Sequence, residues 1–226
     1  MGVTANKLIA DIRNIVSSGP TSDDFRISDR QILYWVGEVR STLISQAIQK
    51  KQDLSDIWIQ RIKSADLSLV DISECPELPV DCTILRTDSI IPNTVEVDNN
   101  NLIISVTGLD GTPLTKLNYF RSRYKKYSKF TKSNKGWFLR NGYIYVINSN
   151  ELKYITINGI FEDPSELETF YCSNEPCWTR DDEYPISMKM ASMVTDIVVK
   201  TKALPFLQFP QDSKSDSANL EQMNKQ

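Results

Sequence analysis

Along the first part of the chain, hydrophobic residues recur with a helical period. Those from Leu8 to Val16 fall at positions i, i+1, i+4, i+7 and i+8, which places them on one face of a helix. Thr4 is a suitable N-cap, and a Gly-Pro pair follows as a stop signal. We therefore predict a first helix over residues 5–18.

A second and longer hydrophobic stripe follows Ser28. Gln31 stands three residues after this serine and completes a capping-box pattern. Apolar positions then continue from Ile32 to Ile48, so a helix over 29–51 is predicted as a strut about 33 Å long. The pattern also predicts helical structure through residue 64, with a short third helix near three more hydrophobic residues: Ile57, Trp58 and Ile62.

From about residue 67 the hydrophobic period changes to two, which is typical of strands. Turn residues (Pro, Asn, Asp and Gly) separate the segments. Asn141-Gly142 between apolar flanks is the clearest hairpin signal. We predict a β-rich insert over 66–161 with these strand candidates: LSLVDIS (67–73), VDCTILRT (80–87), TVEV (94–97), LIISVTG (102–108), GWFLRNGYIYVI (136–147) and KYITINGIF (153–161).

The chain leaves the last strand through an acidic turn that contains a proline, residues 161–165. A short helix over 165–171 and a longer one over 185–203 are predicted next, with Pro185 at the first helical position. Asp181, Asp182 and Glu183 precede this proline. They either match the helix dipole or form an acidic metal site.

The last 23 residues, 204–226, lack the hydrophobic content of a compact element. Two prolines bracket three large apolar side chains, and a polar stretch follows. Ordering such a segment costs backbone entropy that it cannot recover alone. We therefore predict an extended arm that docks on a neighbouring protein through its apolar anchors: Phe206, Leu207 and Phe209.

Together these patterns predict an α+β fold. Residues 1–65 form the N-terminal helices of an antiparallel helical bundle, and 162–203 return to complete it. The β-rich insert (66–161) separates them in sequence, and the extended arm (204–226) follows. The turn at 161–165 is interpreted as the return from the insert to the bundle, which fixes the angle between the two parts.

Composition argues against most catalytic classes. The 226 residues include no histidine, which removes the commonest general base and metal ligand. We therefore expect no enzyme, no cofactor and no metal. The four cysteines (75, 82, 172 and 177) lack C-x-x-C spacing, so ordinary reduced thiols are expected, with an all-cysteine zinc site as the alternative. No apolar run approaches the about 20 residues of a membrane span.

A basic and aromatic stretch over 120–137 stands out in a chain of net charge −3. Aromatic residues are interleaved with the cations, a composition that suits phosphate contact and base stacking. The alternatives are a solvated hairpin and an arm that docks on an acidic protein. The cations considered as contact residues are Arg121, Arg123, Lys125, Lys126 and Lys129.

Three stretches resemble a known family: ISDRQILYWVGEVRSTLI (27–44), YITINGIFEDPSEL (154–167) and DDEYPISMKMASMV (181–194). In these stretches and in the order of its elements, the chain resembles head-to-tail connector proteins of short-tailed phages, the adaptor or tail-tubular-protein-A class. It is most similar to the ring protein below the portal of crAss-like phages.

The resemblance implies helices that carry a β-rich domain, no enzymatic activity, and a ring of twelve copies around the DNA exit channel. The implied partners are the portal protein, other tail and ring proteins, and further copies of the chain, with non-specific contact to genome DNA and no membrane. The implied location is the virion, after assembly in the cytoplasm of the bacterial host.

Two rival hypotheses come from other classes of protein. One is a cytosolic nucleic-acid-binding module that uses residues 121–135. The other is a carboxylate-based enzyme, for which the sequence offers only the acids at 181–183 and at 162–163.

Overall fold

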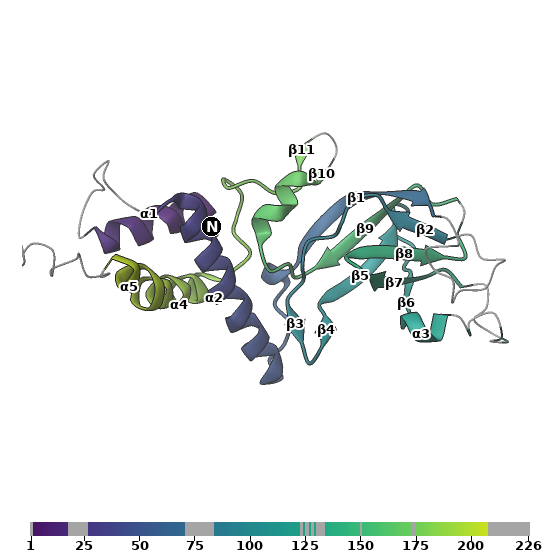
Figure 1. The fold of residues 1–226 in the computed structure, drawn as a ribbon, viewed down its shortest axis with the longest axis horizontal. Helices are drawn as coiled ribbons and strands as arrows, with labels where there is room; N and C mark the ends of the chain where they lie inside the picture. The colour runs from purple at the N-terminus through teal and green to yellow at the C-terminus, as the bar shows by residue number, and fades with distance from the viewer. Residues whose placement is uncertain are drawn as a thin grey trace, which may run out of the picture.

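A helical part and a β-sheet part lie side by side, and a long helix reaches from the first toward the second (Figure 1). The computed structural model describes residues 2–17, 27–70, 84–122, 134–149, 151–172 and 175–207, together with residues 124, 127 and 129. The mixed α+β class predicted from the hydrophobic pattern is confirmed.

The first two helices begin at the caps that the sequence predicted. Helix α1 spans Ala5–Val16, and the Thr4 hydroxyl accepts a hydrogen bond from the backbone N–H of Lys7 at 3.2 Å. Helix α2 spans Asp29–Gln49, and the Ser28 hydroxyl accepts the N–H of Gln31 at 3.2 Å. In both cases a side-chain oxygen satisfies an amide that has no partner inside the helix.

The C-terminal helix differs from its prediction at both ends. Helix α4 spans Met188–Val198 and begins after Ser187, so the expected start at Pro185 is wrong. The reason is local: the Ser187 hydroxyl can accept the N–H of Met190, at 3.2 Å, whereas proline has no capping oxygen.

Beyond α4 the chain stays helical where an extended arm was expected to start. A π-helical turn, η5 (Val199–Ala203), is followed by α5 (Leu204–Leu207), which contains Pro205. A proline inside a helix removes one backbone hydrogen bond and crowds the preceding turn, and a widened π turn relieves that crowding. The arm prediction is therefore wrong for 204–207, and residues 208–226 lie outside the described part of the chain.

Helices α1, α2 and α4 contact one another in pairs, as predicted. Their buried faces join one hydrophobic core, whose fully buried members include Leu8, Ile32 and Val194. Lys202 of η5 also pairs with Glu38 of α2 at 2.8 Å. The finer prediction of an antiparallel bundle stays a prediction.

Among the described residues, the main sheet has seven strands in the order β5-β9-β1-β2-β8-β7-β6. Neighbouring strands are antiparallel except for β6 and β7. Its strands are β1 (Gln60–Leu69), β2 (Ile84–Thr87), β5 (Ile103–Gly108), β6 (Thr115–Lys116), β7 (Gly136–Arg140), β8 (Tyr143–Ile147) and β9 (Tyr154–Gly159). A separate two-stranded ribbon joins β3 (Glu96–Val97) to β4 (Asn100–Asn101).

The predicted third helix is wrong. Only a 3-10 turn, η1 (Asp56–Trp58), precedes β1, and Ile62 lies inside that strand. Ile62 is buried while Arg61 and Lys63 on either side are exposed, which is a period of two. Strand β9 pairs with this segment along its length and supplies the backbone hydrogen bonds that a helix would have supplied internally.

The predicted Asn-Gly hairpin is confirmed between β7 and β8. Asn141 and Gly142 both adopt positive φ angles, 51° and 77°, and Arg140 pairs with Tyr143 across the turn. Two successive left-handed residues match the twist of the flanking strands, and glycine accepts this conformation without steric strain.

The two faces of the sheet are buried in different ways. Alternate residues such as Trp137 and Val146 join the core that also contains the helices. Their neighbours Phe138 and Tyr145 stack at 5.2 Å in a smaller cluster on the opposite face, beside α3 (Tyr119–Ser122). The structure therefore has one core that continues through both parts and a satellite core under α3.

A small element lies between the helices and the sheet. The predicted short helix over 165–171 is a 3-10 helix, η4 (Pro164–Thr169), and it leads into a hairpin of β10 (Tyr171–Cys172) and β11 (Glu175–Pro176). Strand β10 packs beside β1, so this element bridges back to the sheet (Figure 1).

Candidate functional site: the helix–sheet junction and the predicted contact residues

The guanidinium of Arg40 joins the three places where the chain passes between the helical part and the sheet part. Its Nη1 donates to the Phe161 carbonyl at 2.7 Å, just after β9. Its Nε donates to the Pro185 carbonyl at 3.1 Å, before α4. Its Nη2 donates to the Trp58 carbonyl at 3.4 Å, before β1. One side chain on α2 thus holds all three crossings.

Arg40 is fully buried, with 0% of its surface exposed. Burial lowers the pKa of its guanidinium, while electrostatic interaction with Tyr184 and Asp163 acts in the opposite direction. Arginine starts from so high a pKa that it stays charged. Its hydrogen bonds go to neutral backbone carbonyls, so the junction is a buried cation coordinated by peptide dipoles.

Tyr184 completes the surroundings of this cation. Its ring centroid lies 5.9 Å from the Arg40 guanidinium carbon, within cation–π range. Burial, as the main cause, raises the pKa of its hydroxyl, and the nearby Arg40 charge partly opposes this. The phenol is therefore neutral and packs against the cation as a ring.

Sequence analysis missed Arg40, although the pattern contained a signal. Arg40 lies four residues from both Val36 and Ile44, which are fully buried on the same face of α2. A cation within the apolar stripe of a helix is expected to be buried with it, and a buried charge needs hydrogen-bond or charge partners.

The acidic turn at 161–165 is fixed to α2, as the sequence suggested. The Ser41 hydroxyl donates to the Glu162 carbonyl at 3.3 Å, and the Glu162 N–H donates to the Asn93 carbonyl at 2.8 Å. Asp163 caps η4 by accepting the N–H of Ser165 at 2.9 Å. Side chain, backbone and cap therefore all hold this turn, and its role in fixing the angle between the two parts stays a prediction.

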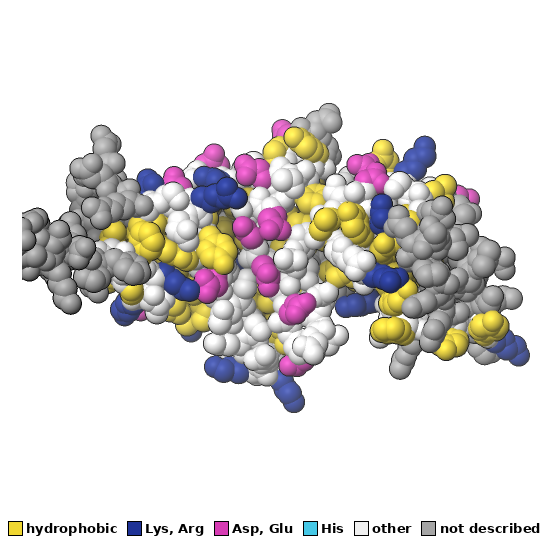
Figure 2. Space-filling model, viewed as in Figure 1, with side chains coloured by type: hydrophobic (Ala, Val, Ile, Leu, Met, Phe, Trp, Pro, Cys, Tyr) yellow, Lys and Arg dark blue, Asp and Glu magenta, His cyan; other side chains and the backbone are white. Residues whose placement is uncertain are grey.

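Acidic side chains gather on the surface between the two parts (Figure 2). A hollow there is lined by Glu38, Glu162, Asp163 and Glu166. Partial burial, followed by the charge of Glu96, raises the pKa of Glu162. Partial burial, with Asp163 and Glu162, raises that of Glu166. Within the described residues, no group of acids or cysteines converges well enough to hold a metal ion.

The three acids before α4 have separate partners. Asp181 accepts the Asn6 amide at 2.7 Å, Asp182 accepts the Thr179 N–H at 2.7 Å, and Glu183 accepts the Gly2 N–H at 2.8 Å. They fasten the N-terminal residues and a loop. Because α4 begins only at Met188, the interpretation that they face a helix N-terminus at Pro185 is wrong.

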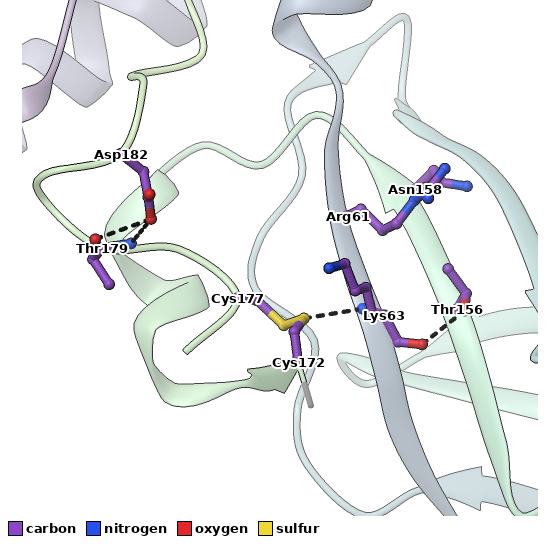
Figure 3. Close-up of a disulfide and its surroundings, with 8 residues drawn as sticks. All are labelled: Arg61, Lys63, Thr156, Asn158, Cys172, Cys177, Thr179 and Asp182. Atoms are coloured by element: carbon purple, nitrogen blue, oxygen red, sulfur yellow. Dashed lines mark hydrogen bonds between the residues drawn. A yellow bond between two sulfur atoms is a disulfide. The ribbon is translucent and has the colours of Figure 1, made fainter. Parts of the chain in front are cut away.

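Cys172 and Cys177 form a disulfide, so the expectation of reduced thiols is wrong for this pair (Figure 3). Their Cα atoms lie 4.9 Å apart because the β10–β11 hairpin pairs Cys172 with Glu175 and brings the two cysteines together. The Cys172 sulfur also accepts the N–H of Lys63 of β1 at 3.3 Å. The bridge thus attaches the hairpin to the sheet. Cys75 and Cys82 lie outside the described residues.

Of the predicted apolar anchors, two are described and both are partly exposed. Phe206 is 44% exposed and packs edge-on against Trp35, with ring centroids 5.8 Å apart. Leu207 is 39% exposed. Phe209 lies outside the described residues. The first anchor is therefore partly used inside its own chain.

Little of the predicted basic contact segment is described. Helix α3, which contains Phe120 at the start of this segment, lies at the far side of the sheet part, whereas α5 lies at the end of the helical part (Figure 1). Tyr124, Tyr127 and Lys129 are exposed. Four of the proposed contact side chains lie outside what is described: Arg121, Arg123, Lys125 and Lys126. Contact through these residues stays a prediction.

The fold and this site define a structural module: two parts around a shared core, with a junction held by a buried arginine. Comparison with protein families identifies it further. Residues 7–223 match the family described as phage tail ring protein 2 (CrAss_Ring_2), and the chain belongs to this family. It matches none of the curated proteins.

The family confirms the resemblance seen in the sequence and identifies a structural component of the phage tail, which assembles as a ring with other tail proteins. Such a role agrees with the lack of catalytic equipment in the sequence. In the described part of the chain, no helix combines the length and hydrophobicity needed to cross a membrane.

Proposed function

We propose that this chain forms the connector ring that docks under the portal and joins it to the tail around the DNA channel. The observation that carries this proposal is the separation of α5 from α3 on one elongated molecule. Partly exposed apolar residues of α5 lie at the end of the helical part, and α3, where the basic segment of the sequence begins, lies at the far side of the sheet part (Figure 1). A connector must touch different neighbours at different ends.

The junction supports this role because a connector has to keep a fixed angle between its ends. The buried Arg40 holds three crossings, and the disulfide-bridged hairpin attaches η4 to β1. We infer that α1, α2 and α4 (with residues 1–65 and 162–203) act as one antiparallel bundle. The insert 66–161 is carried on it as a second unit.

The proposed ring contains twelve copies, and its proposed partners are the portal, other ring and tail proteins, and further copies of the chain. Docking through α5 and the segment after it would use Phe206, Leu207 and Phe209. Leu207 is the cleanest test residue because it is exposed, whereas Phe206 also packs on Trp35.

Native mass spectrometry of purified protein, with and without purified portal, tests this function. We expect a twelve-copy species that binds the portal. Leu207→Asp should weaken portal binding at least tenfold, whereas Tyr154→Asp, equally exposed at 39% on β9, should not. A protein that stays monomeric, or a ring whose Leu207→Asp variant binds the portal normally, would contradict the proposal.

A nucleic-acid contact is the second candidate function for segment 121–135. Exposed aromatic residues favour it: Phe120, Tyr124 and Tyr127 are 65%, 59% and 75% exposed beside several cations. Rings and cations in this arrangement suit non-specific contact with genome DNA. Binding of the isolated protein to duplex DNA should then weaken steeply with salt. Binding that does not depend on salt, or no detectable binding, would contradict a DNA contact and favour a protein partner for these cations.

A further inference from the structure

Two hollows on the helical side of the junction share a lining residue. The first lies between the start of β1 and the start of α4, and its lining includes Gln60 and Met188. The second lies between α1 and α4, and its lining includes Leu8 and Met188. Because Met188 lines both, the two hollows are neighbours, and together they are called the furrow. Their volumes, about 490 and 690 Å³, exceed what one side chain fills.

Gln60 gives this furrow an unsatisfied recognition group. The side chain is 92% buried, since 8% of Gln60 is exposed, and it lines the first hollow. Neither its Nε2 nor its Oε1 has a hydrogen-bond partner among the described residues. A buried amide without partners is unfavourable, so it is typically matched by a ligand or water. One acceptor and two donors side by side complement a peptide group or another amide.

Large apolar side chains lie exposed along the furrow. Met188 is 59% exposed, Ile57 at the first hollow is 53% exposed, and Ile15 at the second is 54% exposed. An elongated furrow with apolar edges and one buried amide fits an extended polypeptide better than a compact small molecule.

We propose that this furrow binds residues 208–226 of a neighbouring copy of the chain, laid along it as an extended strand. The 19 residues after Leu207 can reach about 60 Å when extended. They supply apolar side chains for the edges and several side-chain amides that can pair with Gln60: Gln211, Asn219, Gln222, Asn224 and Gln226.

The choice of a neighbouring copy rests on the proposed ring. In a ring, each subunit offers one surface to the next and receives a different one, so a segment and its furrow can sit on the same chain. Leu204, at the start of α5, lines the second hollow of its own copy, so the test has to distinguish the chain's own segment from that of a neighbour. The family match also continues to residue 223, so most of the segment belongs to the family pattern.

The test uses the full-length chain with a photo-crosslinking amino acid at position 188, assembled from equal amounts of isotopically light and heavy copies. We expect cross-links from position 188 to peptides within 208–226, with mixed isotope labels because they join two copies. The same probe at Leu69, which is 68% exposed on β1 and outside both hollows, is the control and should not capture this segment.

Each other outcome overturns the inference. Cross-links within one copy would make the occupant the chain's own C-terminal segment, and cross-links elsewhere or none would leave the furrow without this occupant. Native mass spectrometry of the same sample separates the two proposals. Rings without the cross-link overturn only the furrow, whereas a monomer overturns the connector function as well.

Gln60→Leu provides a second measurement. It distinguishes a Gln60 that binds the segment from a Gln60 that only stabilises the fold. We expect the cross-link yield to fall at least fivefold. The melting temperature of unassembled protein should stay the same or rise, because an unsatisfied amide is removed. An unchanged yield, or a large fall in melting temperature, would show that the amide does not receive the segment.

Discussion

Arg40 shows how one buried residue can organise a molecule made of two parts. A buried cation is unfavourable unless dipoles or charges surround it. Here the required dipoles are the Trp58, Phe161 and Pro185 carbonyls, which belong to three separate chain crossings. Each buried carbonyl needs a hydrogen-bond donor, and the cation needs acceptors. The contact therefore holds α2 and the three crossing segments in place together.

Arg40→Ala should destabilise the protein by about 3–5 kcal/mol, because it leaves buried carbonyls unpaired and opens a cavity. Chemical denaturation measures this change. Arg30→Ala is the matched control, since Arg30 is exposed on the same helix, and it should shift stability by less than about 0.5 kcal/mol. Equal effects of the two variants would mean that the buried contact contributes nothing particular.

Glu166 leads to a prediction about pH. Partial burial and neighbouring acids raise its folded-state pKa above the ordinary value of 4.5. The folded state therefore binds a proton more tightly than the unfolded chain. Stability from this group is complete below the ordinary pKa and is lost as pH rises through the higher, folded-state value.

Glu166→Gln should consequently raise the melting temperature slightly at pH 7 and leave it unchanged near pH 3, as measured by scanning calorimetry. Glu168→Gln removes one negative charge from the same 3-10 helix and is the control for that loss. A gain that persists at pH 3, or an equal gain from Glu168→Gln, would contradict this explanation.

Helix α2 has one face buried in the core and another face exposed to solvent. Trp35 is 8% exposed within the shared core, whereas its neighbour Tyr34 is 62% exposed. We expect Trp35→Asp to unfold the helical part, because it places a charge in the core and removes a large ring. Tyr34→Asp should leave the fold intact. Circular dichroism melting compares them, and a folded Trp35→Asp protein would refute the packing of these helices.

The β10–β11 hairpin is the element whose stability should depend on redox state. Its disulfide joins residues five positions apart, and the chain-entropy relation gives about 2 kcal/mol for so short a loop. In a background with Cys75 and Cys82 replaced by alanine, reductant should lower the free energy of unfolding by up to that amount. Adding Cys172→Ala and Cys177→Ala should abolish the response. If reductant leaves the free energy of unfolding of the background protein unchanged, the protein has no such disulfide.

Charge is distributed unevenly along the sequence and over the surface of the molecule. Cations are concentrated in residues 121–135 of the sequence, whereas acidic side chains gather on the surface between the two parts (Figure 2). Changing Lys125, Lys126 and Lys129 to Glu should reduce particle assembly or genome retention at least tenfold while the isolated protein melts normally. Infectious yield and calorimetry measure the two effects. Particles of normal yield would mean that these lysines only face solvent.

The sequence by itself determined the features that depend on neighbours within a few residues. The caps at Thr4 and Ser28 and the left-handed turn at Asn141-Gly142 are examples. Each depends on a side-chain oxygen or a backbone preference that acts locally, so it can be read without the fold. The α+β class followed from the change of hydrophobic period. The stretches that resemble the ring-protein family were likewise visible without the fold.

The folded structure was needed for features that depend on residues far apart in sequence, and for features where local signals compete. Ile62 is in a strand because β9 pairs with its segment, and Arg40 is tolerated in the core because three distant carbonyls meet it. Cys172 and Cys177 pair because a hairpin brings them together, and α4 starts at Met188 because Ser187 can cap it. In the first two cases the deciding partners are far away in sequence. Ile62 pairs with Ile157, 95 residues later, and Arg40 contacts Phe161 and Pro185, 121 and 145 residues later. Local periodicity carries no information about such partners. For the disulfide and for the start of α4, the deciding residue is near in sequence. There the sequence offered more than one turn or cap, and only the folded backbone showed which one forms.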